Sequence, residues 1–444
     1  MCFAIRRGKL PDERLDPGFV RNSKKQNYAY PKRSLASLVS EEPCYGTSAS
    51  AVERTSDDQP RYIRITDYGD DGIALPHEFM TAEKWTNKHL LLKGDLLFAR
   101  SGATVGKTYM HNVHFDPAVF AGYRIRFRFN DEVLPEFVYG FTKTDAYALW
   151  VGAIQRPAGQ PNINKEEFKS LEIPFPPLDI QRHLVAELDA ARAERDRALV
   201  EAERLLTSID DLVKAKLELP DLEPPKHAGY AILLTIAKST NTLSADFFHP
   251  ERMQAVRMVQ GLDNAPLSQL VSFQRNIVKT PGESRYIGLA SVSSGTGQLT
   301  EAIETASGQC FAFRPGDVLY GRLRPYLNKI WLATFSGVCS TEFHVMRSLD
   351  TDTLRPEYLA VVMRTSLIVA QTKHMMTGNT HPRIANEDVA NLLVPLTNEK
   401  NQREIVEETL ASQAESARLH AHAETVWREA RERFEQQLLQ GGKP

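Results

Sequence analysis

The chain has 444 residues, of which 42% are hydrophobic and 25% are charged, and its formal net charge is −2 at pH 7. This length fits two or three domains that each bury a core of their own, and the composition excludes a disordered or low-complexity chain. The near-zero net charge leaves nucleic-acid binding open, because phosphate binding depends on local groups of Lys and Arg rather than on their sum.

The N-terminal segment begins with apolar and basic residues but has no apolar run long enough for a signal peptide, and no other stretch is long and apolar enough to span a bilayer. A cytoplasmic protein without a membrane segment is therefore expected. The four cysteines, Cys2, Cys44, Cys310 and Cys339, lie far apart without a CxxC pair. This spacing argues against a zinc site and against a disulfide framework.

The stretch SGATVGKT, residues 101–108, is similar to a phosphate-binding loop. Such a loop needs four residues between its first glycine and the Gly-Lys-Ser/Thr ending, so that successive backbone N–H groups can surround a phosphate. Gly102 and Gly106 enclose three residues. The loop is one residue short, and a nucleotide site is not favoured.

The sequence repeats itself at a separation of about half its length. Residues 91–110 align with residues 313–332, and further blocks recur downstream and upstream in the same order. The aligned positions include Gly94 and Asp95 on Gly316 and Asp317, Arg100 on Arg322, and Lys107 on Lys329. The second copy keeps the lysine but has neither glycine of the loop, so a phosphate cradle is not what the copies share. A tandem duplication is predicted.

Within each copy, short runs rich in β-branched and aromatic residues come first, and Gly, Asp and Asn interrupt them, which predicts strands joined by turns. The Gly-Asp pair predicts a tight turn into a strand that ends at Arg100 or Arg322. A helical stretch opening with Pro-Glu, a loop, and an extended run into proline follow. This order predicts an α+β domain in each copy.

Each copy ends in a long helix whose apolar residues alternate by three and four, the pattern of a coiled coil. The second helix has a weaker pattern with polar interruptions, and we expect it to rely on the first helix. The predicted seam residues are Leu184, Leu188, Leu205, Ile209 and Leu212 in the first helix, and Val406, Leu410, Phe434 and Leu438 in the second. The fold class is therefore α+β, with an internal pseudo-twofold repeat and long coiled-coil-forming helices. The predicted boundaries are residues 1–178, 179–219, 220–398 and 399–444.

The paired Gly-Asp blocks, the proline-to-glutamine run IPFPPLDIQRHLVAEL that leads into the first helix, and the duplicated order of all blocks resemble the DNA-specificity subunit of type I restriction-modification enzymes. The resemblance extends over nearly the whole chain. It implies two target recognition domains, residues 1–178 and 220–398, that each read half of a bipartite DNA sequence. It also implies two spacer helices, residues 179–219 and 399–444, that set the gap between the half-sites.

The resemblance further implies a non-catalytic chain that binds double-stranded DNA and docks two modification subunits, which methylate adenine, through its helices. Restriction subunits with translocase and nuclease activity join that core. S-adenosylmethionine, ATP and Mg are expected in these partner subunits, and no cofactor is expected on this chain. The residues are consistent with a non-catalytic chain, because the sequence contains no methyltransferase Asn/Asp-Pro-Pro-aromatic motif, no HExxH and no His/Cys cluster. No catalytic residue and no metal site are predicted.

Candidate DNA contacts are side chains that can donate to base edges or to phosphates. In the first copy they are Thr47, Ser48, Arg64, Arg100, Ser101, Lys107, Arg156, Gln160 and Asn162. In the second copy they are Arg285, Arg322, Arg324, Tyr326, Lys329, Asn379, His381 and Arg383. For each of them the alternative is a solvated surface charge or an ion pair within the domain, and the shared arginines could equally support the fold.

Two other functions compete with DNA reading. One is a P-loop NTPase or nuclease that uses Lys107, which predicts nucleotide binding by the purified chain. The other is a coiled-coil adaptor whose globular parts do not touch DNA. Salt-dependent DNA affinity separates the adaptor from a DNA reader, because neutralised phosphates release counterions.

Overall fold

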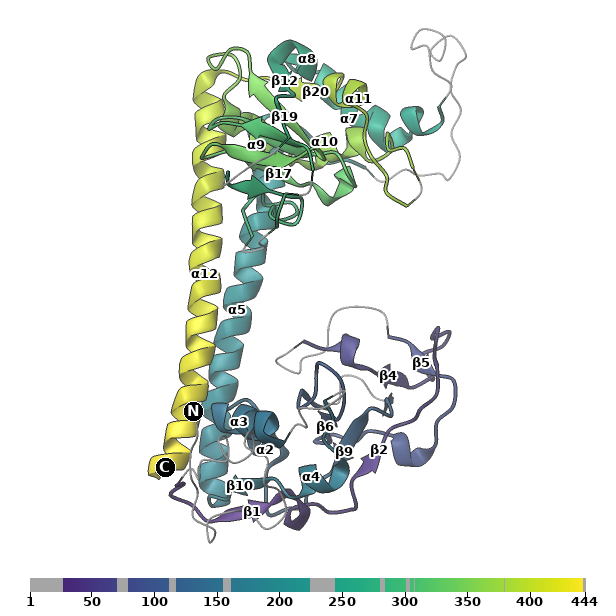
Figure 1. Ribbon diagram of the computed structural model, residues 1–444, viewed down its shortest axis with the longest axis vertical. Helices are drawn as coiled ribbons and strands as arrows, with labels where there is room; N and C mark the ends of the chain where they lie inside the picture. Colours follow the sequence, from purple (N-terminus) through teal and green to yellow (C-terminus); the bar gives the residue numbers. More distant parts are fainter. Residues whose placement is uncertain are drawn as a thin grey trace. The chain divides into compact units, whose positions relative to one another are not determined.

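The computed structural model describes residues 27–69, 79–111, 117–154, 161–223, 244–279, 284–300, 304–306, 308–378 and 380–441. The chain divides into two compact units. The first contains residues 1–198 and 421–444, and the second contains residues 199–420. Both divisions fall inside a long helix, so each unit includes a part of both long helices (Figure 1).

The first unit is built on a four-stranded sheet in the order β2-β9-β6-β7, with every neighbour antiparallel. Beside it, β4 pairs with β8 in parallel, and β1 pairs antiparallel with β10. Its strands are β1 (Lys32–Ser34), β2 (Cys44–Tyr45), β3 (Ala51–Val52), β4 (Arg61–Ile63), β5 (Thr81–Ala82), β6 (Leu96–Ala99), β7 (Thr108–Met110), β8 (Ala118–Phe120), β9 (Arg124–Phe127) and β10 (Glu172–Pro174). Its helices are η2 (Leu35–Ser37), η3 (Ile65–Asp67), η4 (Asn87–His89), α2 (Pro135–Phe141), α3 (Asp145–Ile154), α4 (Lys165–Lys169) and the first part of α5 (Leu178–Lys216).

The second unit repeats this plan with the sheet order β12-β19-β16-β17, with β14 parallel to β18 and β11 antiparallel to β20. Its strands are β11 (Asn264–Pro266), β12 (Val271–Gln274), β13 (Ile277–Val278), β14 (Tyr286–Ile287), β15 (Cys310–Phe313), β16 (Val318–Gly321), β17 (Ile330–Leu332), β18 (Gly337–Ser340), β19 (Phe343–Ser348) and β20 (Leu393–Pro395). Its helices are η6 (Asp246–Phe248), α7 (Pro250–Gln260), α8 (Leu267–Leu270), η7 (Pro325–Leu327), α9 (Pro356–Val362), α10 (Ser366–Thr372), α11 (Asn386–Ala390) and part of α12 (Glu399–Gln440). The matching strand orders confirm the α+β fold class and the duplication predicted from the sequence.

The Gly-Asp pair forms the predicted turn into a central strand, and it also anchors that strand. Gly94 and Gly316 both have φ near +87°, a conformation that favours glycine. The aspartates that follow are fully buried. Asp95 accepts two hydrogen bonds of 2.7 Å from the guanidinium of Arg128, and Asp317 accepts two of 2.7 and 2.9 Å from that of Arg347. Each pair joins the two central strands of its sheet.

A buried glutamine fixes the start of each long helix. The amide oxygen of Gln181 accepts a hydrogen bond from Leu134 N at 2.9 Å, just before α2, and its amide nitrogen donates to Pro176 O. Gln402 accepts from Arg355 N at 3.0 Å, just before α9, and donates to Thr397 O. The proline-to-glutamine run of the sequence is therefore a joint that sets each helix against its own domain.

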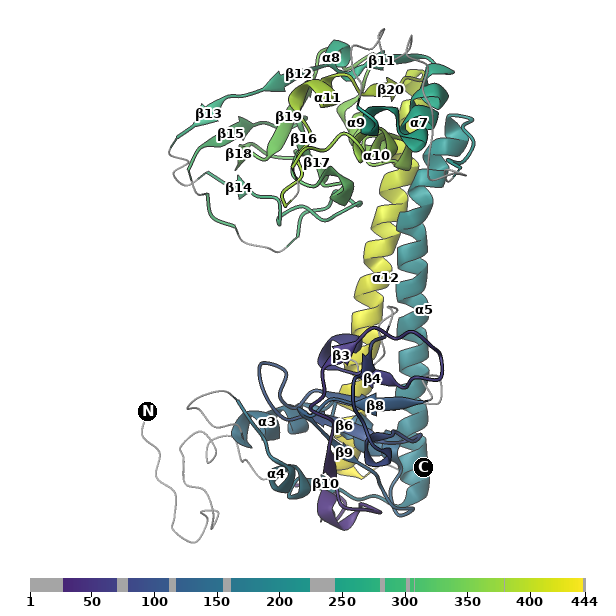
Figure 2. The same cartoon turned by 90° about the vertical axis from the view of Figure 1, so that its right-hand side faces the viewer.

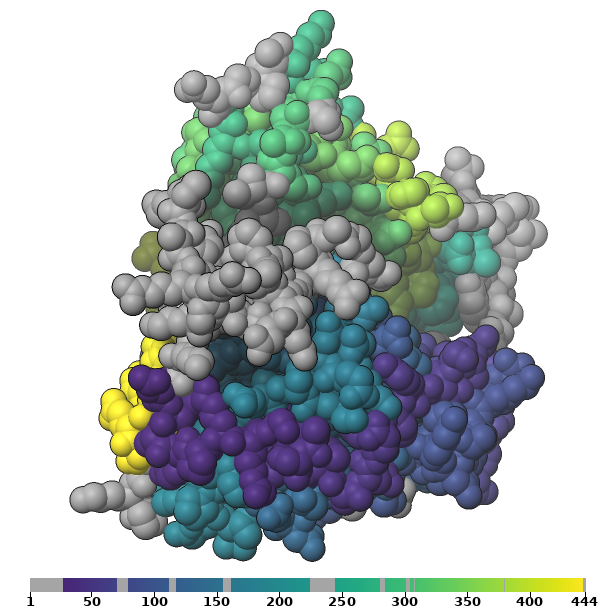
Figure 3. Space-filling view, turned by 60° about the horizontal axis from the view of Figure 1, so that its bottom comes forward, coloured from purple at the N-terminus to yellow at the C-terminus, as the bar shows by residue number. Residues whose placement is uncertain are grey.

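The long helices lie side by side within each unit, as Figures 1 and 2 both show. In the first unit, Leu184 and Leu188 of α5 share a core with Phe434 and Leu438 of α12. Figure 3 shows the purple N-terminal segment of this unit beside the yellow end of α12. Between these two segments, Ala29 N donates a hydrogen bond to Leu438 O at 3.0 Å. The C-terminal helix thus completes the core of the N-terminal domain.

In the second unit, Val406 of α12 is 9% exposed and belongs to the core, whereas Leu205, Ile209 and Leu212 of α5 are half-buried. The prediction for Leu410 is wrong, because its side chain is 56% exposed. The inward face of α12 instead carries Thr409 and Ser416 in this unit and Ala423 in the first unit, and their exposed fractions are 1 or 2%. These small side chains form the seam in positions that a search for large apolar residues does not find.

A carboxylate of the long helix from the opposite repeat caps the second helix of each domain. Asp145 N and Ala146 N, at the start of α3, donate to the carboxylate of Glu435 at 3.1 and 3.2 Å. At the start of α10, the backbone N and the hydroxyl of Ser366 both donate to Asp210 at 2.7 Å. Each unit therefore binds the long helix of the other repeat through equivalent polar contacts as well as through its core.

Candidate nucleic-acid interface

The glycine-rich stretch at residues 101–108 is a hairpin connection and not a phosphate cradle. It joins the antiparallel strands β6 and β7, whereas a phosphate-binding loop leads from a strand into a helix. Four of its backbone N–H groups already have acceptors: Gly102 N donates to Pro161 O at 3.0 Å, Gly106 N donates to Ala99 O at 2.9 Å, and the N–H groups of Val105 and Lys107 donate to carbonyls within the loop. With a hairpin in place of a strand-to-helix turn, and with both glycine N–H groups engaged, the loop is not a phosphate-binding loop, which removes the basis of the NTPase alternative.

The lysine that both copies share ties a neighbouring loop to the sheet. Lys107 Nζ donates to Tyr68 O at 3.2 Å. Lys329 Nζ donates to Leu289 O at 2.8 Å and to Val292 O at 2.9 Å. In both units the acceptors follow the strand that pairs in parallel, β4 or β14. The common role of these lysines is structural, and DNA contact through either of them stays a prediction.

The two units build the same backbone frame around the arginine that ends the central strand. Arg100 N donates to Tyr123 O at 3.0 Å, and Arg322 N donates to Glu342 O at 2.9 Å. The carbonyl oxygens of these arginines then accept hydrogen bonds from Ile163 N at 2.8 Å and from Ile384 N at 3.1 Å.

A third hydrogen bond of the frame also recurs, and it connects the loop after the strand with the loop before α4 or α11. Gly102 N donates to Pro161 O in the first unit, and Arg324 N donates to Pro382 O at 2.7 Å in the second. Isolated β-bridges join the same two loops, between Ser101 and Asn162 and between Leu323 and Arg383. The structure thus holds both candidate reading loops of each unit together.

In the first unit this frame carries a polar and aromatic surface. The guanidinium of Arg100 lies over the ring of Tyr45, 4.9 Å from its centroid. The Tyr45 hydroxyl accepts a hydrogen bond from Lys165 N at 3.3 Å. Tyr45 and Tyr123 are 37 and 38% exposed. Exposed aromatic rings can stack on bases or contact sugars. The neighbouring arginine can donate hydrogen bonds to base edges or to phosphates.

In the second unit the same frame carries charged groups. Arg383 donates from its Nε and Nη2 atoms to the carboxylate of Glu342 at 2.8 to 3.1 Å. Arg322 Nε lies 4.0 Å from the same carboxylate. These cations hold the pKa of Glu342 below its usual range, chiefly through the hydrogen bonds from Arg383. One carboxylate therefore holds Arg383 by hydrogen bonds and lies near a second candidate reading arginine, Arg322.

Two further side chains of this surface point out of the domain. Arg324 is exposed, and no described residue accepts a hydrogen bond from its guanidinium. Its backbone is left-handed, with φ near +50°, where a non-glycine residue is strained. Tyr326, in η7, is 46% exposed. The exposed guanidinium of Arg324 is available to a ligand.

The remaining candidates divide into engaged and exposed residues. The Thr47 hydroxyl is buried and donates to Lys84 O at 2.8 Å. Arg64 forms a bidentate pair with Asp67 at 3.0 and 3.2 Å. Ser48 and His381 are exposed, and Arg285 lies over the ring of Phe335 at 3.9 Å. Arg156, Gln160 and Asn379 lie outside the described residues.

The candidate surface also includes residues that the sequence analysis missed. Tyr45, Tyr123 and Glu342 come from strands and turns far from the reading loops in sequence, so only the fold brings them together. Tyr123 and Glu342 occupy equivalent places in the two frames. The repeat alignment was the one available signal for this pair of frame positions.

A buried arginine lies next to Tyr123 in the sequence. The guanidinium of Arg124 lies over the Tyr68 ring, 4.5 Å from its centroid, and burial lowers the pKa of this guanidinium to about 9.

A buried histidine beside the second surface makes this unit sensitive to acid. Burial, and next the charge of Arg322, lower the pKa of His344 to about 4. The unfolded chain binds this proton near pH 6.5. The neutral His344 ring therefore makes its full contribution to the unfolding free energy above about pH 6.5. This contribution is lost as the pH falls toward 4.

We expect the unfolding free energy of the second unit to fall by about 2 kcal/mol more between pH 7 and pH 5 in the wild type than in His344→Gln, whose side chain does not titrate. Urea titrations followed by hydrogen exchange in β16 and β19 at both pH values measure this difference. An equal fall in both proteins would contradict the proposed linkage.

Comparison with known proteins shows likeness to one class of protein. Residues 60–197 match the family described as "Type I restriction modification DNA specificity domain". Over 115 residues the chain is 29% identical to the type I restriction enzyme EcoDI specificity subunit of Escherichia coli. That alignment covers 26% of this chain and 23% of the relative.

One solved structure extends the likeness in fold to nearly the whole chain. A chain from a structure of the assembly and conformational transition of the type I R-M system matches with a TM-score of 0.52 and 16% identity, over 96% of this chain and 99% of that chain. The S subunit of the type I restriction-modification system from M. genitalium matches over 95 and 99% of the two chains, with 12% identity and a TM-score of 0.46. The resemblance to type I specificity subunits inferred from the sequence is confirmed.

Proposed function

We propose that this chain is the DNA-specificity subunit of a type I restriction-modification complex and binds a bipartite DNA sequence. One observation carries the proposal. The two units present different side chains from one backbone frame, so that Tyr123, Gly102 and Asn162 of the first correspond to Glu342, Arg324 and Arg383 of the second. Two readers of one fold that recognise different half-sites need this combination of a constant frame and variable surface.

The residues of the frame fit the chemistry of base reading. Arginine donates in a bidentate manner to guanine, and asparagine pairs in the same way with adenine. Because Glu342 holds Arg383 by hydrogen bonds, that side chain loses less entropy on binding DNA. We assign the target recognition domains to residues 1–178 and 220–398, and the spacer helices to residues 179–219 and 399–444.

We further propose that the chain is non-catalytic and that two modification subunits and the restriction subunits supply the chemistry, with S-adenosylmethionine, ATP and Mg bound there. Among the described residues no helix has the length and apolar character needed to cross a membrane. The occupied N–H groups of the 101–108 hairpin support a role without nucleotide binding.

A single exposed arginine gives a direct test of DNA reading in the second unit. Arg324→Ala should weaken binding to the cognate duplex about 10-fold or more at fixed salt, because one good base contact contributes about 1 to 3 kcal/mol of discrimination. Fold stability should not change, since the guanidinium has no partner among the described residues. Fluorescence anisotropy with the cognate duplex and with a scrambled duplex measures the effect.

The control is Arg257→Ala, which removes the same charge from an exposed position on α7. Loss of affinity in the control alone, or in both variants equally, would contradict reading by Arg324. Uniform weakening on both duplexes with a smaller salt slope would reassign Arg324 to a phosphate. Salt-independent affinity of the wild type would favour the adaptor alternative.

We propose that the partner subunits dock on the long helices, where two apolar side chains face solvent. Val200 of α5 is 70% exposed and Leu410 of α12 is 56% exposed. The double variant Val200→Asp/Leu410→Asp should lower the amount of modification subunit that copurifies about 10-fold, because apolar contacts at an interface centre contribute 1 to 2 kcal/mol or more. Leu149→Asp, an exposed leucine on α3, is the control. Unchanged copurification would place the docking surface elsewhere.

A further inference from the structure

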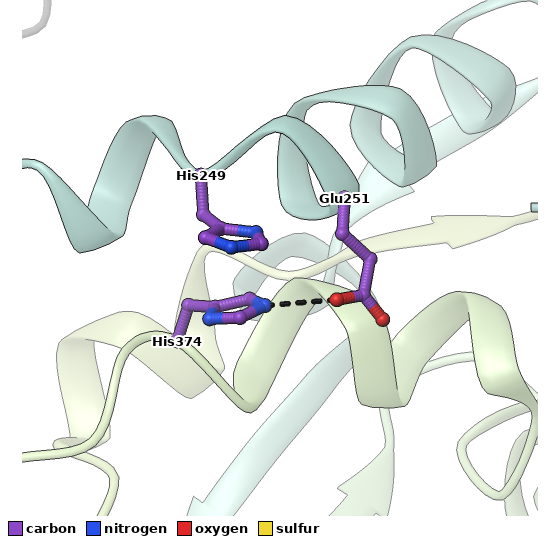
Figure 4. Close-up of side chains that lie close together, drawn as sticks. All are labelled: His249, Glu251 and His374. Atoms are coloured by element: carbon purple, nitrogen blue, oxygen red, sulfur yellow. Dashed lines mark hydrogen bonds and ion pairs between the residues drawn. The ribbon is translucent and has the colours of Figure 1, made fainter. Parts of the chain in front are cut away.

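Two histidines and a glutamate meet where α7 begins and α10 ends. His249 immediately precedes α7, Glu251 lies in its first turn, and His374 follows the last turn of α10 (Figure 4). One donor atom from each of the three residues lies within 4.8 Å of the others. His374 Nε2 lies 3.0 Å from Glu251 Oε2, and the imidazole rings of His249 and His374 stack with centroids 3.5 Å apart.

These donors form the kind of set that binds a divalent transition metal. Neutral imidazole nitrogen and carboxylate oxygen together suit zinc and its neighbours nickel, cobalt and copper, whereas magnesium and calcium prefer oxygen alone. The side chains of Glu251 and His374 are 20 and 18% exposed, so the cluster is partly shielded but can be reached by an ion.

The backbone around the cluster is fixed by packing that does not depend on the cluster itself. Ala255 and Val259 of α7 are buried against Leu367 and Ala370 of α10. This apolar contact holds the start of α7 beside the end of α10. Donors from two segments far apart in sequence can bind one ion only if the fold holds these segments together in this way. Sequence spacing alone could not show it, and the sequence predicted no metal site.

The donor set is not part of the duplicated scaffold. When residues 15–19 are aligned with residues 243–247, Arg21 and Ser23 stand at the positions of His249 and Glu251. Neither residue supplies a nitrogen or carboxylate ligand. The cluster is therefore a property of the second repeat alone, and the fold common to both repeats does not require it.

A lysine competes for the carboxylate. Lys373 Nζ donates to Glu251 Oε1 at 2.7 Å, while the other oxygen of the carboxylate faces His374. A metal ion bound through Oε2 leaves the lysine contact in place, but its charge is repelled by the ammonium. The lysine therefore lowers the affinity of the site for a cation without removing a ligand.

We propose that His249, Glu251 and His374 bind one divalent transition metal ion of the zinc class, which fastens the start of α7 to the end of α10. The two rings tilt apart from their stack so that one nitrogen of each points at the ion, and water completes the coordination. His374 also begins the segment that leads to His381 and Arg383 of the candidate reading surface. The ion thus steadies the base of that segment.

The test uses the full-length chain without a polyhistidine tag, with zinc and cobalt chlorides as probes. Isothermal titration should give one site with a dissociation constant in the micromolar range or below, and cobalt should give visible absorption bands of a four- or five-coordinate site. Zinc at about 100 times its dissociation constant should raise the Tm of the second unit by about 5 °C or more.

Variants separate the site from adventitious binding. His374→Ala and Glu251→Gln should each weaken zinc binding more than the roughly 10- to 100-fold that loss of a second-shell partner costs. Lys373→Met should tighten binding, because it removes the competing charge and keeps all three ligands. His420→Ala, at an exposed histidine on α12, should bind zinc as the wild type does.

Equal zinc affinity in the wild type, His374→Ala and Glu251→Gln would overturn the proposal, and the cluster would then be an ion-pair network of Glu251 with Lys373 and His374. Unchanged or weaker binding by Lys373→Met would also count against it. Should His374→Ala be unstable, the Lys373→Met and Glu251→Gln titrations decide the question, because these changes preserve the size of the side chains.

Discussion

Asp317→Asn should destabilise the second unit by about 3 kcal/mol or more. The substitution removes the charge that the Arg347 guanidinium faces inside the sheet, and breaking a buried pair leaves one ion without compensation. In the wild type, hydrogen bonds to Asp317 raise the pKa of the Arg347 guanidinium. In the variant this effect is lost, but an arginine keeps its charge at neutral pH through its ordinary basicity. Urea titration of the full chain, followed by hydrogen exchange in β16 and β19, measures the loss.

Two controls separate the loss of the buried ion pair from the loss of a negative charge in general. Asp352→Asn neutralises an exposed aspartate of the same unit and should change the unfolding free energy by less than about 0.5 kcal/mol. The double variant Asp317→Leu/Arg347→Met should recover most of the stability, because apolar residues of similar volume can replace a buried pair. A single variant as stable as Asp352→Asn would show that the Gly-Asp motif does not anchor the sheet, and its recurrence would need another explanation.

Phe434→Ala should destabilise the first unit by about 3 to 5 kcal/mol, although Phe434 lies more than 300 positions along the chain from the four-stranded sheet of that unit. The ring is 1% exposed and lies 5.7 Å, between centroids, from that of Phe137. Gly140 of α2 leaves the space that the ring fills, since a Cβ atom there would stand 3.2 Å from it. Hydrogen exchange of β6 and β9 under increasing urea measures the effect.

Leu410→Ala is the matched control for Phe434→Ala on the same helix. Its side chain is 56% exposed, so the unfolding free energy should change by less than about 0.5 kcal/mol. If Phe434→Ala leaves the exchange of β6 and β9 unchanged, the C-terminal helix is not part of the first unit's core.

The sequence was sufficient for the fold because the chain contains two independent versions of the same pattern. The recurrence of Gly94 and Asp95 at Gly316 and Asp317 identified the turn and the central strand before any contact was known. What it could not reveal was the partner of each aspartate. Arg128 and Arg347 lie one strand away, and alternating apolar patterns do not report which charge faces which.

The seam of the C-terminal helix shows a different limit. Large apolar residues at Val406, Phe434 and Leu438 pack as the heptad pattern predicts, yet Leu410 faces solvent and Thr409 is buried. The helix packs against two different units along its length, so its buried face is set by each domain in turn rather than by one continuous seam. Where the inward residues are small or polar, the heptad pattern therefore predicts the wrong buried residue at single positions.

For the candidate site, the repeat alignment located the frame and residue chemistry supplied the candidates. Arg100, Arg322 and Arg383 lie at that frame, but Lys107 and Lys329 donate to backbone carbonyls within their own domains. Tyr45 and Glu342 were missed because they become neighbours of the arginines only when distant strands pair. Residue type alone does not distinguish a lysine that ties a loop from one that faces a ligand.

The central claim is that each repeat reads one half of a bipartite DNA sequence. The most direct measurement is co-expression of this chain with a cognate modification subunit, followed by single-molecule sequencing of host DNA for methylated adenine. We expect a bipartite motif with a fixed gap that disappears when this chain is deleted. Replacing the second frame's variable side chains by those of the first, with Glu342→Tyr, Arg324→Gly and Arg383→Asn, should alter or abolish recognition of one half-site only. Methylation that does not depend on this chain, or a triple variant that changes both half-sites together, would contradict it.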